Sequence, residues 1–200
     1  MTAGGHAARA GRGRLDPRAR GGRAVVRAVL RYPAPALKAV ARPLDPAETA
    51  EIARVAGDLL DTMHAHAGCV GLAAPQLGEL VRMVALDLSG HPKATSCAGE
   101  LVLVDPVVTA ESGADVAREG CLSIPDLTAN VRRATAVQIA ASDPAGAPLT
   151  VTADGFEARC LLHELDHLDG ILFLDRVDSL ATDVFRRRRG RPQPRPPQAG

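Results

Sequence analysis

The sequence predicts an α+β fold in which short antiparallel strands pack around a central helix. Three observations support this class. Two segments repeat apolar residues at helical spacing, several shorter segments have the Val-rich and Ile-rich composition of strands, and the two kinds of segment do not alternate as they do in βαβ units. The 200 residues are enough for one domain with tails.

The first helix is expected to begin at Asp45 and to fade between His64 and Gly68. Asp45 is a good N-cap residue, Pro46 suits the first helical position, and Glu48 stands where the acid of a capping box belongs. The apolar residues that follow at helical spacing are Ile52, Val55, Ala56, Leu59, Leu60 and Met63. They give this helix one face for the core.

Three apolar segments are predicted as strands, at residues 81–88, 101–108 and 131–141. The turn sequence at 142–146 predicts that residues 148–152 pair back as the second strand of a hairpin.

A second helix is predicted over residues 154–169, because Gly170 provides a C-terminal stop. A third helix is predicted over residues 178–189. The second helix carries the most informative residues of the chain and is therefore the expected centre of the fold.

Composition excludes two classes of protein. Hydrophobic residues make up 46% of the chain but aromatic residues only 2%, so the core must be aliphatic and a base-stacking nucleic-acid platform is excluded. No stretch approaches the ~20 apolar residues of a membrane span, and the start lacks the apolar run of a secretory signal. Four cysteines without an export signal indicate a reducing compartment, and we expect a cytoplasmic protein.

The net charge of +1 conceals an uneven distribution. Residues 1–24 contain six Arg and one Asp, and residues 186–200 contain six Arg and no acid. Residues 25–185 contain 22 acidic against 12 basic residues. We therefore expect one acidic folded domain at 25–185 between two disordered basic extensions. The C-terminal extension is either a solvated end or a weak contact for RNA or another polyanion.

The second predicted helix contains the sequence His163-Glu164-Leu165-Asp166-His167, which matches H-E-x-x-H. Residues i and i+4 of a helix project side by side, so the two imidazoles can bind one metal ion. Glu164 reaches the same place without being a ligand and can handle the proton of a bound water. A chance match on a solvated helix is the alternative, but the leucine-rich flanks favour a buried helix.

A catalytic metal site of this kind needs a third ligand. The candidates are Cys121, Cys160, Asp166 and one of His64 and His66. Ligands at i, i+3 and i+7 of one straight helix spread over more than ~10 Å, which disfavours Cys160. The two histidines are expected at the surface, at the fraying end of the first helix.

Two further segments carry possible chemistry. In the first, Gly71 allows close approach of backbone to a ligand, and Gln76 offers an amide donor for a developing oxyanion. In the second, Gly120 precedes Cys121 and Pro125 ends the segment, which is a plausible way to aim a thiolate. Taken alone, the first could be a tight turn and the second a buried structural cysteine.

Together, in this order and spacing, the three segments resemble the motifs of the peptide deformylase family. The family motifs are G-x-G-L-A-A-P-Q, E-G-C-L-S and Q-H-E-x-D-H. They correspond here to residues 69–76, 119–123 and 162–167, and the segment 29–37 is similar to the family's opening. The resemblance spans roughly residues 29 to 175, and three motifs in register are highly specific.

The resemblance implies one divalent metal per chain, held by Cys121, His163 and His167, with water as the fourth ligand. Fe(II) is the implied native metal, and Ni, Co or Zn are possible. The metal-bound water would attack the formyl carbon of an N-formylmethionyl peptide while Glu164 acts as general base and then acid. Gln76 and the backbone N–H of Leu122 would hold the oxyanion. The products would be formate and a free amine.

The resemblance also implies a substrate groove and partners. The backbone of Val70, Gly71 and Gly120 would pair with the peptide as an added strand, and Phe156 and Cys160 would line the pocket for the Met side chain. The implied substrates emerge from the ribosome, which the basic C-terminal extension could contact, and no membrane partner is expected. An Fe(II)–thiolate site predicts sensitivity to oxygen.

Three residues depart from the family pattern. Cys69 replaces the first Gly of the first motif, Leu162 replaces the Gln before His163, and Thr128 stands where many members carry a peptide-contacting Arg. These departures are expected to affect the affinity for peptides and the range of substrates more than the reaction itself. The alternatives are a deformylase-like protein with an altered amide substrate, a small H-E-x-x-H endopeptidase, and a metal-binding or peptide-binding module without activity.

Overall fold

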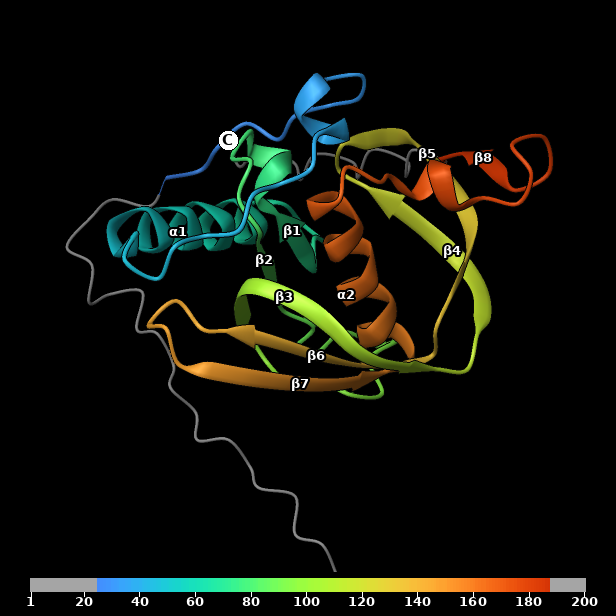
Figure 1. The fold of residues 1–200 in the computed structure, drawn as a ribbon. Helices are drawn as coiled ribbons and strands as arrows, with labels where there is room; N and C mark the ends of the chain where they lie inside the picture. Colours follow the sequence, from blue (N-terminus) through green and yellow to red (C-terminus); the bar gives the residue numbers. More distant parts are fainter. Residues whose placement is uncertain (1–24, 188–200) are drawn as a thin grey trace, which may run out of the picture.

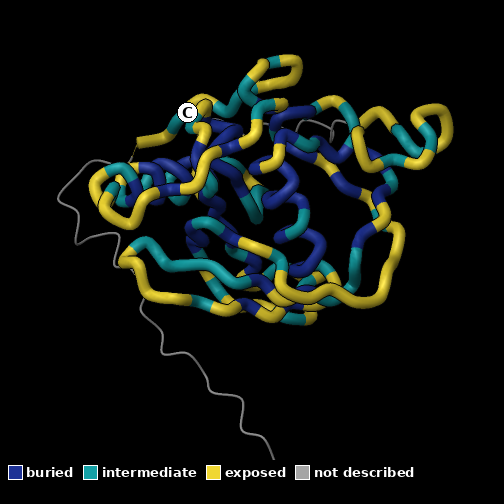
Figure 2. Tube along the Cα trace, in the orientation of Figure 1, coloured by how far each residue is buried: buried dark blue, intermediate teal, exposed yellow. Residues whose placement is uncertain are grey.

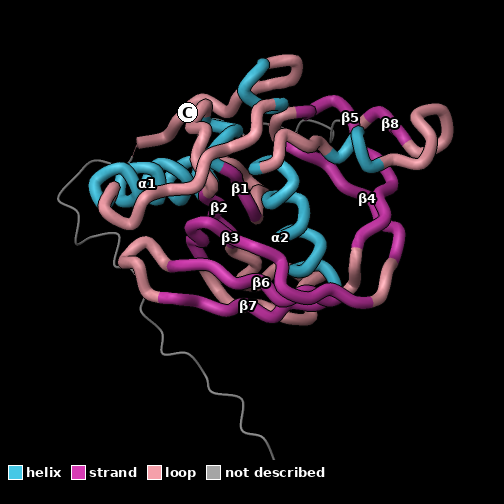
Figure 3. Tube along the Cα trace, in the orientation of Figure 1, coloured by secondary structure: helices cyan, strands magenta, loops and turns pink. Residues whose placement is uncertain are grey.

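The computed structural model describes residues 25–187. The predicted N-terminal extension and residues 188–200 of the C-terminal one lie outside this range. The described residues form two antiparallel sheets, two α-helices and three short 3-10 helices (Figures 1 and 3). The expected α+β class with antiparallel strands around a central helix is confirmed.

The larger sheet has five strands in the order β1-β2-β3-β6-β7. Their bounds are β1 Gly71–Ala73, β2 Met83–Leu86, β3 Leu101–Ser112, β6 Ala136–Ser142 and β7 Pro148–Asp154. The predicted hairpin at its end is confirmed, because β6 pairs with β7 from Ala136 opposite Asp154 to Ser142 opposite Pro148. The other edge of this sheet is the short strand β1, which belongs to the first motif.

The smaller sheet has three strands in the order β4-β5-β8. Their bounds are β4 Asp115–Cys121, β5 Ile124–Arg133 and β8 Val184–Arg186. Strands β4 and β5 form a hairpin in which Cys121 lies opposite Ile124, so residues 122–123 make the turn. The second motif therefore lies in a β-hairpin, with β4 at the edge of the sheet.

Helix α1 (Thr49–Ala65) begins three residues later than predicted, with Glu48 and not Asp45 as its N-cap residue. One contact of a capping box forms, since Glu48 Oε2 accepts from Asp45 N–H, but Asp45 Oδ1 accepts from Ala47 N–H and not from Glu48 N–H. These bonds close a turn that precedes the helix. Glu48 also pairs with Arg42 at 2.9 Å, which holds its carboxylate on the preceding loop.

Helix α2 (Gly155–Leu168) agrees with the predicted second helix and lies between the two sheets (Figure 1). Most of its residues are buried, as the dark trace in Figure 2 shows. Its apolar side chains pack on the larger sheet, where Leu161 and Leu168 contact a cluster that includes Leu86 and Ile139. The third motif therefore lies on a buried helix between the two sheets that contain the first and second motifs.

Two predictions of secondary structure are wrong. The segment predicted as one strand at 131–141 is divided between β5 and β6, which belong to different sheets, with Ala134 and Thr135 between them. The third helix predicted over 178–189 is absent from the described part of that range. There, Asp183 N–H closes a turn on Ser179 and β8 follows, so that Arg186 pairs with Leu127 of β5.

The remaining core lies on the far side of the larger sheet and under the smaller one. Helix α1 packs Leu59 and Met63 with Met83 of β2, and the smaller sheet packs Val131 with Phe173. The 3-10 helices Pro35–Lys38, Ala74–Leu77 and Phe173–Arg176 connect these layers. Within residues 25–187, no helix is both long enough and apolar enough to cross a membrane.

Candidate active site

Three predicted ligand residues come together where α2 meets the end of β4. The Sγ atom of Cys121 lies 3.3 Å from Nε2 of His167, and the ring centroids of His163 and His167 are 5.2 Å apart. One ligand atom from each of the three residues lies within 4.8 Å of the others. All three side chains are buried. The arrangement brings a thiol and two imidazoles around one point.

The first motif supports this cluster through Gln76. Its amide Nε2 donates to Cys121 Sγ at 3.3 Å and to Ser123 Oγ at 3.2 Å, while its Oε1 accepts from Ala73 N–H at 2.9 Å. Gln76 is itself buried in the 3-10 helix that follows β1. The amide predicted as an oxyanion donor is thus fixed beside the thiol.

Glu119 orients His163, a role that the sequence analysis did not identify. Its Oε2 lies 2.9 Å from His163 Nδ1, so Nε2 is the ring atom that faces the cluster. Arg133 donates to both Glu119 oxygens at 2.7 and 3.0 Å, and Arg159 donates to Oε1 at 2.8 Å. An acid next to Gly-Cys in the second motif was a possible signal, but its basic partners lie 14 and 40 residues away.

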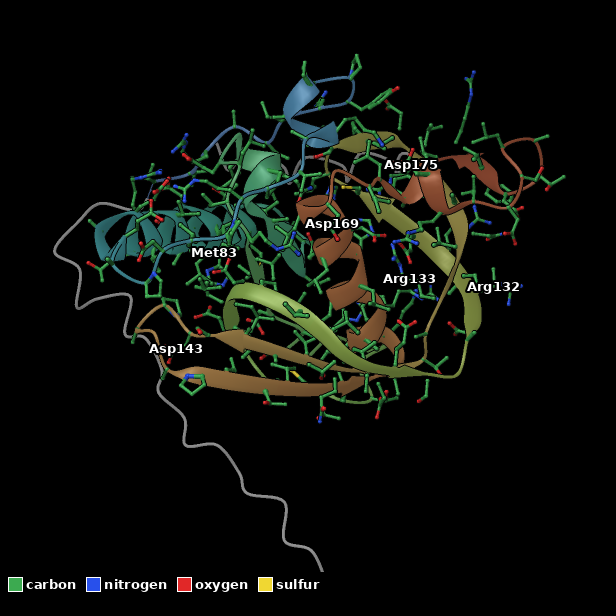
Figure 4. The ribbon with its side chains drawn as sticks, in the orientation of Figure 1. Met83, Arg132, Arg133, Asp143, Asp169 and Asp175 are labelled. Carbon is green, nitrogen blue, oxygen red and sulfur yellow. The ribbon has the colours of Figure 1, made fainter. Side chains whose placement is uncertain are left out.

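Arg133 links this group to α2 a second time. Its Nη1 donates to Asp166 Oδ2 at 2.8 Å, and Arg176 donates to the same carboxylate. Figure 4 shows Arg133 pointing from β5 toward α2, whereas its neighbour Arg132 points away. Strand alternation places one arginine inside and the other in solvent. Asp166, a candidate ligand from the sequence, thus has a structural ion-pairing role.

Contacts set the protonation of the cluster. Burial disfavours a charged Glu119, but hydrogen bonds from His163 and Arg133 outweigh it and hold the pKa of that carboxyl at about 2. Burial also opposes protonation of His163, yet contacts with Cys121 and Glu119 raise the pKa of its imidazole well above the usual value. Burial and the charge of His163 lower the pKa of the His167 imidazole well below the usual histidine value. The second imidazole is therefore neutral.

Glu164 stands apart from this network. Its Oε2 is buried and has no hydrogen-bond partner among the residues that the structure describes. Burial raises the pKa of the Glu164 carboxyl to about 7, against the opposing charges of His163 and Arg133. A Cβ atom at Gly71 would lie 2.7 Å from Glu164 Oε1, so the glycine leaves room for this carboxylate. Glu164 is poised to exchange a proton near neutral pH.

A pocket of about 250 Å³ opens onto the cluster. Its lining includes all five residues predicted to bind substrate, namely Val70, Gly71, Gly120, Phe156 and Cys160. Strands β1 and β4, each the edge of its sheet, border it. Cys69 also lines the pocket and donates from Sγ to Gly71 O at 3.1 Å. Burial and the charge of Glu164 raise the pKa of the Cys69 thiol to about 12.

The other candidate ligands lie outside the cluster. Cys160 is buried on α2 and lines the pocket, and burial raises the pKa of its thiol. His64 is exposed beside Glu100, with 3.0 Å between Nε2 and Oε2, and His66 Nδ1 contacts Thr62 O. The preference for Cys121 over these residues agrees with the geometry.

The cluster fits a divalent metal. A thiolate and two imidazoles are the ligand types of Zn²⁺ and of other borderline transition metals, and three protein ligands leave a position for water or substrate. Glu164 lines the same pocket as Cys121 and His163 and supplies a buried oxygen that has no hydrogen-bond partner within residues 25–187. The Glu119–His163 contact is the carboxylate–histidine pairing that orients metal-bound imidazoles.

Comparison with known proteins decides the family. The sequence model of the polypeptide deformylase family matches residues 26–183. The chain belongs to this family. A peptide deformylase of Brucella suis is 38% identical over 162 residues, which cover 80% of this chain and 89% of that one. One of Alkalilimnicola ehrlichii is 39% identical over 160 residues, which cover 80% and 86% of the two chains.

Solved structures of the family share the fold. A peptide deformylase from Legionella pneumophila matches with a TM-score of 0.70 and 35% identity, covering 78% of this chain and 88% of that one. A Met-Ala-Ser-bound class I type b peptide deformylase from Acinetobacter baumannii matches with a TM-score of 0.71 and 31% identity, covering 78% and 100%. Members of the family are metalloenzyme hydrolases with a single catalytic metal, and this chain is an enzyme of that class.

Proposed function

We propose that this family member removes the N-formyl group from the initiator methionine of nascent polypeptides and releases formate. The observation that carries the proposal is the buried cluster of Cys121, His163 and His167, onto which a pocket opens. Glu164 lines this pocket, and its buried Oε2 has no hydrogen-bond partner in the described part of the chain. Family membership gives the class of reaction. The cluster gives the residues that would perform it.

Cys121, His163 and His167 would hold the metal, for which Fe(II) is our first choice and Zn, Ni or Co are alternatives. When bound, a divalent metal supplies a Lewis acid that polarises the formyl oxygen and lowers the pKa of a coordinated water. Glu119 keeps the Nε2 of His163 directed at the cluster.

Glu164 would move the protons. Its carboxylate takes the proton of the attacking water at Oε2 and then delivers it to the amine that leaves. In the metal-free protein, burial raises the pKa of the Glu164 carboxyl to about 7, so its carboxylate is a stronger base than that of an ordinary Glu. Gln76 Nε2 and the backbone N–H of Leu122, which follows Cys121, would stabilise the negative charge that develops on the formyl oxygen.

The peptide would lie between the edges of the two sheets. Val70 and Gly71 at β1 and Gly120 on β4 line the pocket from the edges of two different sheets, and edge strands bind extended peptides through main-chain hydrogen bonds. Phe156 and Cys160 of α2 would contact the Met side chain. The Acinetobacter baumannii relative, which is Met-Ala-Ser bound, supports a tripeptide of this kind as ligand.

The deciding experiment measures formate release from formyl-Met-Ala-Ser by Fe(II)-loaded protein purified without oxygen. We expect turnover by the native chain. Glu164→Ala should lower kcat by at least 100-fold and retain stoichiometric metal, because it removes the proton carrier and leaves the ligands. No formate release by metal-loaded native protein would contradict the proposal and favour another amide substrate or a peptide-binding role.

A matched pair of cysteine variants tests the ligand assignment. Cys121→Ser should lose metal, whereas Cys160→Ser should retain it, since only Cys121 belongs to the cluster. The reverse pattern would contradict the assignment. We further propose that the enzyme works in the cytoplasm, where nascent chains emerge. We also propose that residues 25–185, together with Arg186 of β8 and Arg187 at the pocket, form its catalytic domain between basic extensions.

A further inference from the structure

One face of the smaller sheet carries an ordered row of side chains beside the pocket. Gly120 of β4 lies opposite Thr128 of β5, and Thr128 lies opposite Phe185 of β8. The guanidinium carbon of Arg118 is 3.4 Å from the ring centroid of Phe185, and Nη1 of Arg118 donates to Thr128 Oγ1 at 3.3 Å. Arg118 is therefore held on the same face as Gly120.

Arg187 extends this row to the mouth of the pocket. It directly follows β8, and its N–H donates to Asp126 O at 2.8 Å. A Cβ atom at Gly120 would collide with the Arg187 guanidinium and would lie 3.3 Å from Thr128 Cγ2. The missing side chain of Gly120 thus makes room for the guanidinium of a residue 67 positions later in the chain.

The two arginines leave positive charge at the pocket without a matching acid. Arg118 and Arg187 both line the pocket, and neither forms an ion pair with another residue in the range 25–187. The nearest lining acids are already engaged elsewhere in the site. Glu119 pairs with Arg133 and Arg159, and Glu164 is buried beside the metal ligands. An incoming ligand meets uncompensated cations at this side of the groove.

Strand alternation determines which part of a peptide meets these cations, and this step rests on the proposed function. The Met side chain would enter the pocket on the α2 side, where Phe156 and Cys160 lie. Glu119 and Cys121 of β4 face the same side, as the Glu119–His163 contact shows. Successive side chains of an extended peptide point to opposite faces. The side chain after Met would therefore point to the face of Arg118 and Arg187.

We infer that Arg187, supported by Arg118, is a specificity-determining residue that favours formylated peptides with Asp or Glu directly after the formyl-methionine. The guanidinium would pair with the carboxylate of that residue, and a Lys at the same position would be repelled. This assigns a substrate-selecting role to a residue that directly follows strand β8 and lies outside the three sequence motifs.

The test compares formate release from formyl-Met-Glu-Ser, formyl-Met-Ala-Ser and formyl-Met-Lys-Ser at low ionic strength. For the native enzyme we expect kcat/KM to be about fivefold higher for the Glu peptide than for the Lys peptide, with the difference mainly in KM. Arg187→Ala should bring the ratio close to one. Arg186→Ala, which changes an exposed neighbour in β8, should leave the ratio as in the native enzyme.

Two results would overturn the inference. One is a native enzyme that releases formate from all three peptides without distinguishing Glu from Lys, which would leave the proposed function intact. The other is an Arg187→Ala variant that processes all three faster, which would make Arg187 an obstruction in the groove. Calorimetric binding of the products Met-Glu-Ser and Met-Lys-Ser gives the same comparison without turnover, so loss of activity alone does not hide the outcome.

Discussion

At the scale of single residues, the two buried glutamates of the site, Glu119 and Glu164, differ in their hydrogen bonding. Glu119 accepts hydrogen bonds from two arginines and one histidine, whereas Glu164 has a buried oxygen without a partner among the described residues. Their pKa values move in opposite directions, to about 2 and about 7. This division suits one carboxylate for positioning and the other for proton transfer.

The raised pKa of Glu164 predicts that the residue destabilises the metal-free protein. Because the pKa of Glu164 in the folded protein, about 7, exceeds the ordinary Glu value of 4.5, the folded state loses stability as pH rises from about 4.5 to 7. At pH 8, Glu164→Gln should therefore have a free energy of unfolding higher than that of the native chain by on the order of 3 kcal/mol. At pH 4.5, the two free energies of unfolding should differ little. Urea unfolding with a chelator measures both, and an unchanged or lower stability at pH 8 would contradict the prediction.

The lowered pKa of Glu119 predicts the opposite dependence. A folded pKa of about 2 contributes stability above pH 4.5 that is lost as pH falls toward 2. Glu119→Gln should remove that acid dependence, destabilise the protein at pH 7 by about 3 kcal/mol, and weaken metal binding about 10- to 100-fold. Metal titration and urea unfolding measure these effects. The control is Glu111→Gln, which changes an exposed acid on β3. Native-like metal affinity in Glu119→Gln would exclude the orienting role.

At the scale of elements, the sequence predicted those parts that have a strong local signal. Helix α2 and the β6–β7 hairpin have clear periodicity, end signals or turn residues, and both agree with the structure. Strand β4 was not predicted, because Asp115–Cys121 is a polar edge strand with few apolar residues. Strand β8 was mistaken for a helix, because its conformation depends on pairing with β5, which is about 55 residues earlier.

The same distinction applies to the site. Residues within the motifs could be proposed from spacing and resemblance, since metal ligands impose a local pattern. Arg133, Arg159 and Arg187 could not, because each acts through a partner that is distant in sequence and close only after folding. Strand pairing brings these residues to the site, and no local pattern encodes it.

Packing of α2 on the larger sheet predicts a large stability effect far from any chemistry. Leu161 is fully buried in this layer, whereas Leu180 is 70% exposed. Leu161→Ala should cost about 2–5 kcal/mol through lost burial and a residual cavity, and Leu180→Ala less than about 0.5 kcal/mol. Urea unfolding of the two variants provides the comparison. Equal effects would mean that α2 is not held by this packing.

At the scale of the whole molecule, the charge distribution predicts separate roles for the acidic domain and the basic ends of the sequence. Residues 25–185 have an excess of acidic side chains, so any contact with a polyanion is expected at the basic extensions. The C-terminal extension does not begin where composition alone suggests. Arg186 pairs with Leu127 in β8 and Arg187 lines the pocket, so the first two arginines of the basic run belong to the domain.

This boundary sharpens the test of a ribosome contact. Deleting residues 188–200 removes four arginines and leaves Arg187 in place. If the extension binds ribosomal RNA, the deletion should weaken ribosome association and reduce the slope of log affinity against log salt by up to about 3, because each lost phosphate contact removes about 0.7–0.9. Sedimentation with ribosomes at several salt concentrations measures this slope. Arg187→Ala in the full chain should leave the slope nearly unchanged while it alters peptide selection. An unchanged slope in the deletion variant would assign no ribosome contact to the extension.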